Sequence, residues 1–221
     1  MTMNKFSFFV ILIFLSFEVF SQEYSPAVNK NYPKKLLWGD THLHSNQSAD
    51  AWSIGNSNLT PSDAFRFARG EEVVSETGVK AKLRVPLDFL MVSDHATYLG
   101  VFKRIENSDP LLLSTDLGKR WREYMDNDDP RLFTEFVDGL NGNQDQSIEK
   151  EIYEPIWKEI TENVDRFNDP GVFTAFIGYE WTPMPTGDNL HRVVVFKDGA
   201  SKASQIIPFS ALDSDKPEDL W

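Results

Sequence analysis

Cysteine is absent from this chain of 221 residues, and histidine occurs only four times. Without cysteine there is no disulfide, thiolate ligand or cysteine nucleophile, so a bound metal ion would need nitrogen and oxygen ligands. The chain also has no long basic run, and its formal net charge is −12. A surface of this charge repels nucleic-acid backbones and anionic lipids, so we expect neither as a partner.

The first residues have the pattern of a signal peptide. Lys5 precedes an apolar stretch over residues 6–17, and Val19-Phe20-Ser21 places tolerated residues where a signal peptidase reads. The stretch is shorter than the roughly 20 residues that a membrane helix needs. We therefore expect a signal peptide at 1–21 and an exported, periplasmic or secreted protein with no stable membrane span after cleavage. An uncleaved N-terminal anchor is the alternative.

Short apolar segments alternate with amphipathic ones along the rest of the chain, which predicts an α/β fold. The segment 22–34 is expected to be a linker, and 109–146 an insertion with short helices. Thr60 and Pro61 mark the start of one helix, and isoleucines every four residues mark the buried face of another. Strands are expected at 36–39, 87–92, 172–178 and 192–196, and helices at 60–70, at 147–167 and from Pro217.

Histidines and carboxylates follow or flank these expected strands. Side chains alternate between the two faces of a strand, so Asp40, His42 and His44 are expected to point the same way. Four imidazoles and two carboxylates suit Zn²⁺, Mn²⁺ or Fe²⁺ better than Ca²⁺ or Mg²⁺. Glu180 could bridge two ions, while Asp40 and Asp94 are expected to orient the imidazoles beside them. The candidate ligands are His42, His44, Asp50, His95, Glu180 and His191.

Each candidate ligand, taken singly, also fits a structural role. The paired His42 and His44 fit hydrogen-bonded histidines at a strand end, and His95 fits the first turn of a helix. The other three fit a turn residue, a solvated carboxylate and a structural imidazole, at Asp50, Glu180 and His191 respectively.

Four further residues have two readings. Arg69 and Arg192 could bind a substrate anion, because a guanidinium matches a phosphate or sulfate, or they could form surface ion pairs. Trp52 and Trp181 lie near proposed ligands in the sequence and could line a substrate pocket or pack in the core. No catalytic residue is assigned beyond the metal ligands.

Three motifs together resemble a known superfamily. Gly39-Asp40-Thr41-His42-Leu43-His44 with Asp50, Val92-Ser93-Asp94-His95 and Gly178-Tyr179-Glu180 are similar to the motifs of the polymerase-and-histidinol-phosphatase (PHP) superfamily of phosphoesterases. The longer stretches 59–71, 94–100 and 178–182 resemble more narrowly the DUF3604 family of exported PHP-like proteins.

The resemblance implies a distorted (β/α)₇ barrel that holds two or three divalent metal ions (Mn, Zn or Fe). It implies hydrolysis of a small-molecule phosphate ester, or a related ester, by metal-activated water. His42 and His44 match the first ligand pair, Asp50 a third ligand, and His95 the ligand of the second motif. Glu180 matches the bridging carboxylate, and His191 a later imidazole ligand.

One departure from the resembled pattern concerns the end of the barrel. The superfamily's last motif, an Asp-x-His or similar pair, has no counterpart because no histidine follows His191. Members of the resembled family are longer, so we expect residues 35–221 to form the N-terminal part of an incomplete PHP-type barrel. The alternative function is a catalytically incomplete metal-binding fragment or half-domain that needs a missing C-terminal part.

Overall fold

The computed structural model describes residues 35–140 and 150–221. The expected signal peptide at 1–21, the expected linker at 22–34 and the last residues of the expected insertion at 109–146 lie outside these ranges. The elements below belong to the compact unit Leu37–Trp221.

Three parallel strands form the central sheet in the order β1-β4-β5. They are β1 (Gly39–Leu43), β4 (Phe89–Val92) and β5 (Thr174–Phe176). The middle strand, β4, is buried along Leu90 to Val92, as its continuous apolar sequence predicts. This sheet and the helices around it make a mixed α/β fold, and no closed barrel is present in the described residues.

The first strand starts later than expected. The apolar residues Leu36, Leu37 and Trp38 precede it and are exposed, whereas the strand itself begins at Gly39, which pairs with Phe89. A Cβ atom at Gly39 would lie 2.3 Å from the Phe89 carbonyl oxygen, so this close pairing requires glycine. As a result Asp40 and His42 lie within an edge strand, and only His44 follows it.

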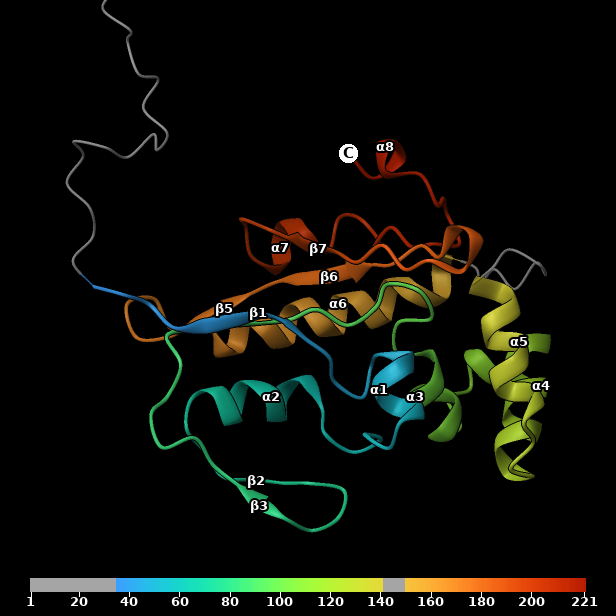
Figure 1. Cartoon of the computed structure of the whole chain (residues 1–221), viewed down its shortest axis with the longest axis horizontal. Coiled ribbons are helices and arrows are strands. Elements are labelled where there is room, and N and C mark those ends of the chain that lie inside the picture. The colour runs from blue at the N-terminus through green and yellow to red at the C-terminus, as the bar shows by residue number, and fades with distance from the viewer. Residues whose placement is uncertain (1–34, 141–149) are drawn as a thin grey trace, which may run out of the picture. The chain divides into compact units, whose positions relative to one another are not determined.

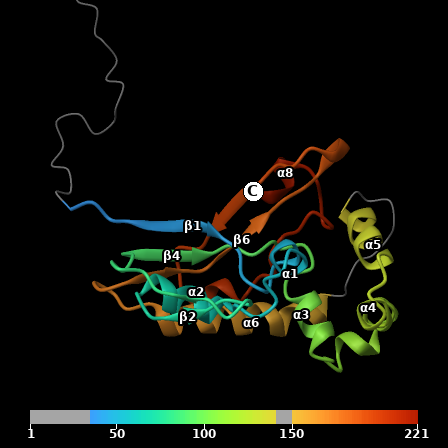
Figure 2. The same ribbon diagram turned by 60° about the horizontal axis from the view of Figure 1, so that its bottom comes forward.

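Two helices cover one face of this sheet, as Figures 1 and 2 show: α2 (Pro61–Ala68) packs on β4, and α6 (Lys150–Phe167) packs on β5. The start of α2 is as predicted, because the Thr60 hydroxyl accepts the Asp63 N–H at 3.2 Å and the Asp63 carboxylate accepts the Thr60 N–H at 3.0 Å. Pro155 lies inside α6 and does not divide it.

The predicted strand over 172–178 contains β5, and its last residue already begins a second strand. After β5 the chain turns into β6 (Gly178–Trp181), which pairs with β7 (Arg192–Val195) in an antiparallel hairpin. The strands β6 and β7 therefore do not form a parallel βαβ unit. Because the pairing is antiparallel, the beginning of β7 lies beside the end of β6, with Arg192 opposite Trp181.

Short helices follow β4, and the first, α3 (Val101–Glu106), precedes the expected insertion. The described part of the insertion contains α4 (Asp116–Asp126) and α5 (Arg131–Leu140), with a 3₁₀ turn at Leu112–Ser114. Aromatic side chains hold them together, since the ring of Phe102 lies 4.9 Å from that of Trp121 and 5.4 Å from that of Phe136.

The remaining elements are short. They are α1 (Ala49–Ser53), β2 (Val73–Val74), β3 (Lys80–Ala81), a 3₁₀ turn (Pro185–Gly187), α7 (Ala200–Ala203) and α8 (Pro217–Leu220). Pro217 opens α8 as predicted. No helix within the described ranges combines the length and apolarity needed to cross a membrane.

Candidate metal centre

A completely buried carboxylate, that of Glu180 on β6, lies at the centre of the candidate site. The Nε2 atoms of His42 and His44 each lie 2.7 Å from its Oε2 atom. His191 Nδ1 contacts the other oxygen, Oε1, and the Thr182 hydroxyl donates to the same atom at 2.6 Å. Three imidazoles from two separate segments therefore converge on one carboxylate.

A second carboxylate, that of Asp50 on α1, extends the cluster. Its Oδ2 atom lies 2.9 Å from His44 Nδ1 and 3.6 Å from His95 Nε2. The Ser48 hydroxyl donates to the other oxygen at 2.5 Å and orients the carboxylate. His44 thus faces Glu180 with one ring nitrogen and Asp50 with the other.

The order of the strands explains how these groups meet. His44 follows β1 and His95 follows β4, and neighbouring parallel strands end at the same edge of a sheet. The backbone at His95 bridges to Glu180, because the Ala96 N–H donates to the Glu180 carbonyl and the Glu180 N–H to the Asp94 carbonyl. The β6–β7 hairpin then places His191, which immediately precedes β7, beside Glu180.

The cluster carries its own charge compensation in the absence of other cations. Burial would raise the pKa of Glu180, but hydrogen bonds to His44 and Thr182 and the nearby His95 hold it well below its usual range. Burial would lower the pKa of His44, but hydrogen bonds to Asp50 and Glu180 raise it to about 10. In the described part of the chain, no lysine or arginine pairs with Glu180.

These donors fit a divalent metal ion. Two groups have ligand atoms within 4.8 Å of one another: His42, His44 and Glu180 form one, and His44, Asp50 and His95 the other. Imidazole nitrogens and carboxylate oxygens together suit Zn²⁺, Mn²⁺ and Fe²⁺. A divalent ion held among these ligands would compensate the charge of the buried Glu180 carboxylate. The structure therefore brings all six sequence-predicted ligands into one cluster that could hold metal.

The two aspartates expected to orient imidazoles occupy different positions. Asp40 is exposed and accepts the backbone N–H of His42 at 2.8 Å. Asp94 is buried and accepts both the N–H and the hydroxyl of Ser45, at 2.5 and 2.7 Å. The Asp94 carboxylate therefore fixes the backbone after His44 by bonding Ser45, rather than orienting the imidazole of His95.

The two arginines proposed for anion binding are placed very differently. Arg69 ends α2, and the preceding Ala68 carbonyl accepts the N–H of Leu87, which comes just before β4. Arg69 thus lies near the beginning of β4, whereas His95 lies after its end. Arg192 adjoins the cluster, but it is exposed and its guanidinium donates to the His191 carbonyl at 2.8 Å.

The two tryptophans also separate. Trp181 is fully buried, and its indole N–H donates to the Ser214 carbonyl at 3.2 Å. It therefore packs in the core, which is one of the two roles expected for it. Trp52 is partly exposed and lines a cavity among the helices α1, α3, α4 and α5.

Sequence reasoning missed two hydroxyl groups at the site. Thr182 bonds both Glu180 and His95 Nδ1, the latter at 2.9 Å. Its position two residues after Glu180 could have revealed it, because residues i and i+2 of an extended chain share a face. Ser48 stands two residues before Asp50, but it acts from a turn, where no such periodicity applies.

One family comparison matches the whole of the described chain. The profile of the family described as "Protein of unknown function (DUF3604)" covers residues 31–221. The chain belongs to the DUF3604 family. No curated protein and no solved structure matches this DUF3604 chain. The family name assigns no activity, so the chemistry of the cluster must be argued from its own residues.

Proposed function

We propose that this chain is a metal-dependent hydrolase of phosphate esters or closely related esters, with PHP-like chemistry. The observation that carries the proposal is the convergence of four imidazoles and a second carboxylate around the buried Glu180. Two or three Mn, Zn or Fe ions are proposed as the cofactors. Divalent ions in such sites activate water and neutralise the group under attack.

The residues of the chain then have separate roles. His42, His44 and Glu180 would hold one ion, and Asp50 and His95 would complete a second position, with His191 contributing beside Glu180. Thr182 and Ser48 hold the two carboxylates in orientation through their hydroxyl groups. Asp94 fixes the segment between the first ligands and Asp50 by binding Ser45.

The proposal includes a fold and a location. We propose that the parallel sheet β1-β4-β5, with its site residues at one edge, is part of a distorted PHP-type barrel. We further propose that the protein is exported after removal of residues 1–21. Expression in an exporting bacterial host should give a mature chain that starts at Gln22, and an intact N-terminus on exported protein would contradict cleavage there.

A second candidate function is a metal-binding chain that does not turn over esters by itself. It is supported by the openness of the cluster, because the side chains of His42, Asp50 and His191 are 47%, 46% and 45% exposed. A hydrolase that excludes water and positions its substrate normally encloses its metal ligands more fully.

Metal content and turnover distinguish the two candidates. Purified protein loaded with Mn²⁺ or Zn²⁺ is expected to hydrolyse a generic aryl phosphodiester or phosphomonoester. Glu180→Gln and His42→Ala are each expected to reduce both metal content and turnover. Glu162→Gln, on the exposed side of α6, is the matched control and should change neither.

Three outcomes are informative. Turnover that depends on Glu180 supports the hydrolase. Metal binding without turnover of phosphate, sulfate or carboxylate esters supports the second candidate. Less than about one ion per chain at saturating metal would remove the basis of both.

A further inference from the structure

A cavity of about 300 Å³ connects the ligand cluster with α5. Asp50, His95 and His191 are among its lining residues, so a group held at the cluster would project into this space. Its large apolar lining residues are Phe133, Phe136, Val137, Leu140 and Met184.

The helix α5 contributes two phenylalanine rings to this cavity, and that of Phe133 is largely exposed. Phe136 is anchored in the body of the fold, with its ring 5.6 Å from that of Tyr98 and 5.4 Å from that of Phe102. Phe133, one turn earlier on the same helix, is 61% exposed although it lines the cavity. A large apolar side chain exposed beside a polar cluster is typical of a binding surface.

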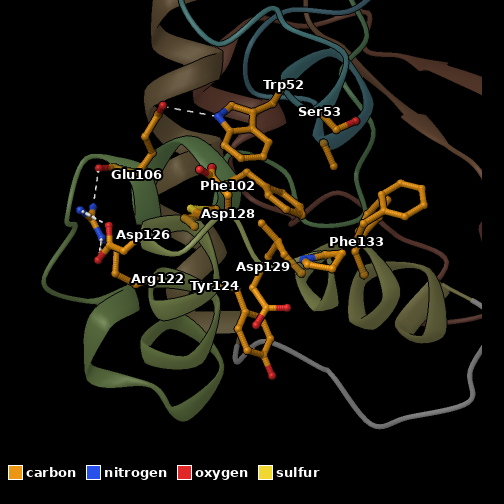
Figure 3. A pocket seen from close by; sticks show the side chains of 15 residues that line it. Trp52, Ser53, Phe102, Glu106, Arg122, Tyr124, Asp126, Asp128, Asp129 and Phe133 are labelled. Carbon is orange, nitrogen blue, oxygen red and sulfur yellow. Dashed lines mark hydrogen bonds and ion pairs between the residues drawn. The ribbon is translucent and has the colours of Figure 1, made fainter.

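A second cavity of about 520 Å³ neighbours the first, because Ala49, Phe133 and Phe136 line both. Figure 3 shows Trp52, Phe102 and Phe133 around it. Together the two spaces have the size of a pocket for a small organic molecule. Aromatic rings therefore line both cavities, and we call the two together the path.

The charges along this path are almost all negative. Glu106, Asp126, Asp128 and Asp129 line the second cavity, and its only cationic residue among those described is Arg122. Arg122 is already engaged, since it pairs with Asp126 at 2.8 Å and donates to the Glu106 carbonyl at 2.8 Å. Glu106 and Asp129 also have ion-pair partners, Lys103 at 2.7 Å and Arg131 at 2.5 Å. The carboxylates still outnumber the cations beside them, so a second anionic group on a ligand would meet net repulsion rather than an unpaired cation.

We propose that this path binds the alcohol part of the ester, and that this part is an apolar ring system without a negative charge of its own. The inference rests on the proposed function, because the ligand cluster determines where the ester group lies. Stacking on Phe133 and Phe136 would supply the affinity, and the carboxylates beyond them would reject anionic extensions.

Binding of non-hydrolysable phosphonates tests the proposal without relying on turnover. In calorimetric titrations of metal-loaded protein, (2-naphthylmethyl)phosphonate is expected to bind at least about tenfold more tightly than methylphosphonate. A carboxylate added to the far end of the naphthalene should abolish that gain. Phe133→Ala should remove most of it, and it should fold normally because the ring is exposed. Trp38→Ala removes another exposed ring, outside both cavities, and should have no effect.

The failure of this proposal is distinguishable from failure of the proposed function. Equal affinity for both phosphonates, or an unchanged preference in Phe133→Ala, would overturn the ring-binding path while the metal site stands. If neither phosphonate binds, the metal site has failed, and 2-naphthol is then titrated into metal-free protein. Saturable binding that weakens in Phe133→Ala supports the path, and its absence overturns it.

Discussion

Raising the pH is expected to strengthen metal binding at this cluster, because a metal ion must displace a proton from His44. Burial opposes the charge on this imidazole, but its bonds to Asp50 and Glu180 outweigh burial and raise its pKa to about 10. At pH 7 only about one metal-free molecule in a thousand has a neutral His44, which weakens apparent binding by about 4 kcal/mol. The apparent association constant should therefore rise about tenfold per pH unit below pH 10.

Calorimetric titration with Zn²⁺ or Mn²⁺ between pH 7 and 8.5 measures this effect. Over that range the association constant should rise about 30-fold. Repeating the titration in buffers with different ionisation enthalpies should show release of about one proton from His44 for each bound ion that it ligates. An affinity that changes less than about threefold, with no released proton, would refute the argued role of His44.

The same pKa shift sets the sign of a stability effect in metal-free protein. A raised imidazole pKa stabilises the fold fully below the unfolded value of 6.5, and this contribution is lost as the pH rises toward 10. Metal-free protein should therefore lose stability from pH 7 to 10. Metal-loaded protein should lose much less, since the ion replaces the proton.

Two further predictions concern residues near the site. Thr60→Ala removes the side-chain cap of α2 and should lower the free energy of unfolding in urea by about 1 kcal/mol. Thr60→Ser keeps a hydroxyl group and should retain most of this stability. Equal losses in the two variants would contradict the role of the cap. Burial raises the pKa of Asp94 to about 6 despite its bonds to Ser45, so the folded protein binds this proton more tightly than the unfolded chain. The stability that this proton contributes therefore falls as the pH rises from 4 to 7. Over that range the free energy of unfolding of Asp94→Asn should increase by up to about 3 kcal/mol relative to that of the wild type. A constant difference between the two proteins would contradict the shift in pKa.

The membership of the cluster could be predicted from the sequence, because short-range patterns determine it. His42 and His44 are two residues apart in extended chain, and His95 follows a continuous apolar run that had to be a buried strand. Parallel strands then bring these residues to the same edge. The same reasoning located the start of α2, where Thr60 and Asp63 cap each other.

The arrangement around Glu180 could not be predicted, because it depends on tertiary pairing. The apolar run over 172–178 is compatible with one long strand, and only packing shows that β5 ends at Phe176 and that a second strand, β6, begins at Gly178. The position of His191 follows from the antiparallel hairpin, whose ten-residue connection has no short turn signal. Phe133 was missed for the same reason, since its helix is amphipathic and nothing local shows which element its exposed side faces.

Metal stoichiometry tests the central claim most directly, namely that six side chains from four segments form one metal centre around Glu180. Protein saturated with Mn²⁺ or Zn²⁺ and freed of excess ions is expected to retain about two ions per chain by elemental mass spectrometry. Glu180→Gln is expected to retain less than about one, with Glu162→Gln equal to the wild type. Less than about one ion in the wild type, or an unchanged content in Glu180→Gln, would contradict the assignment.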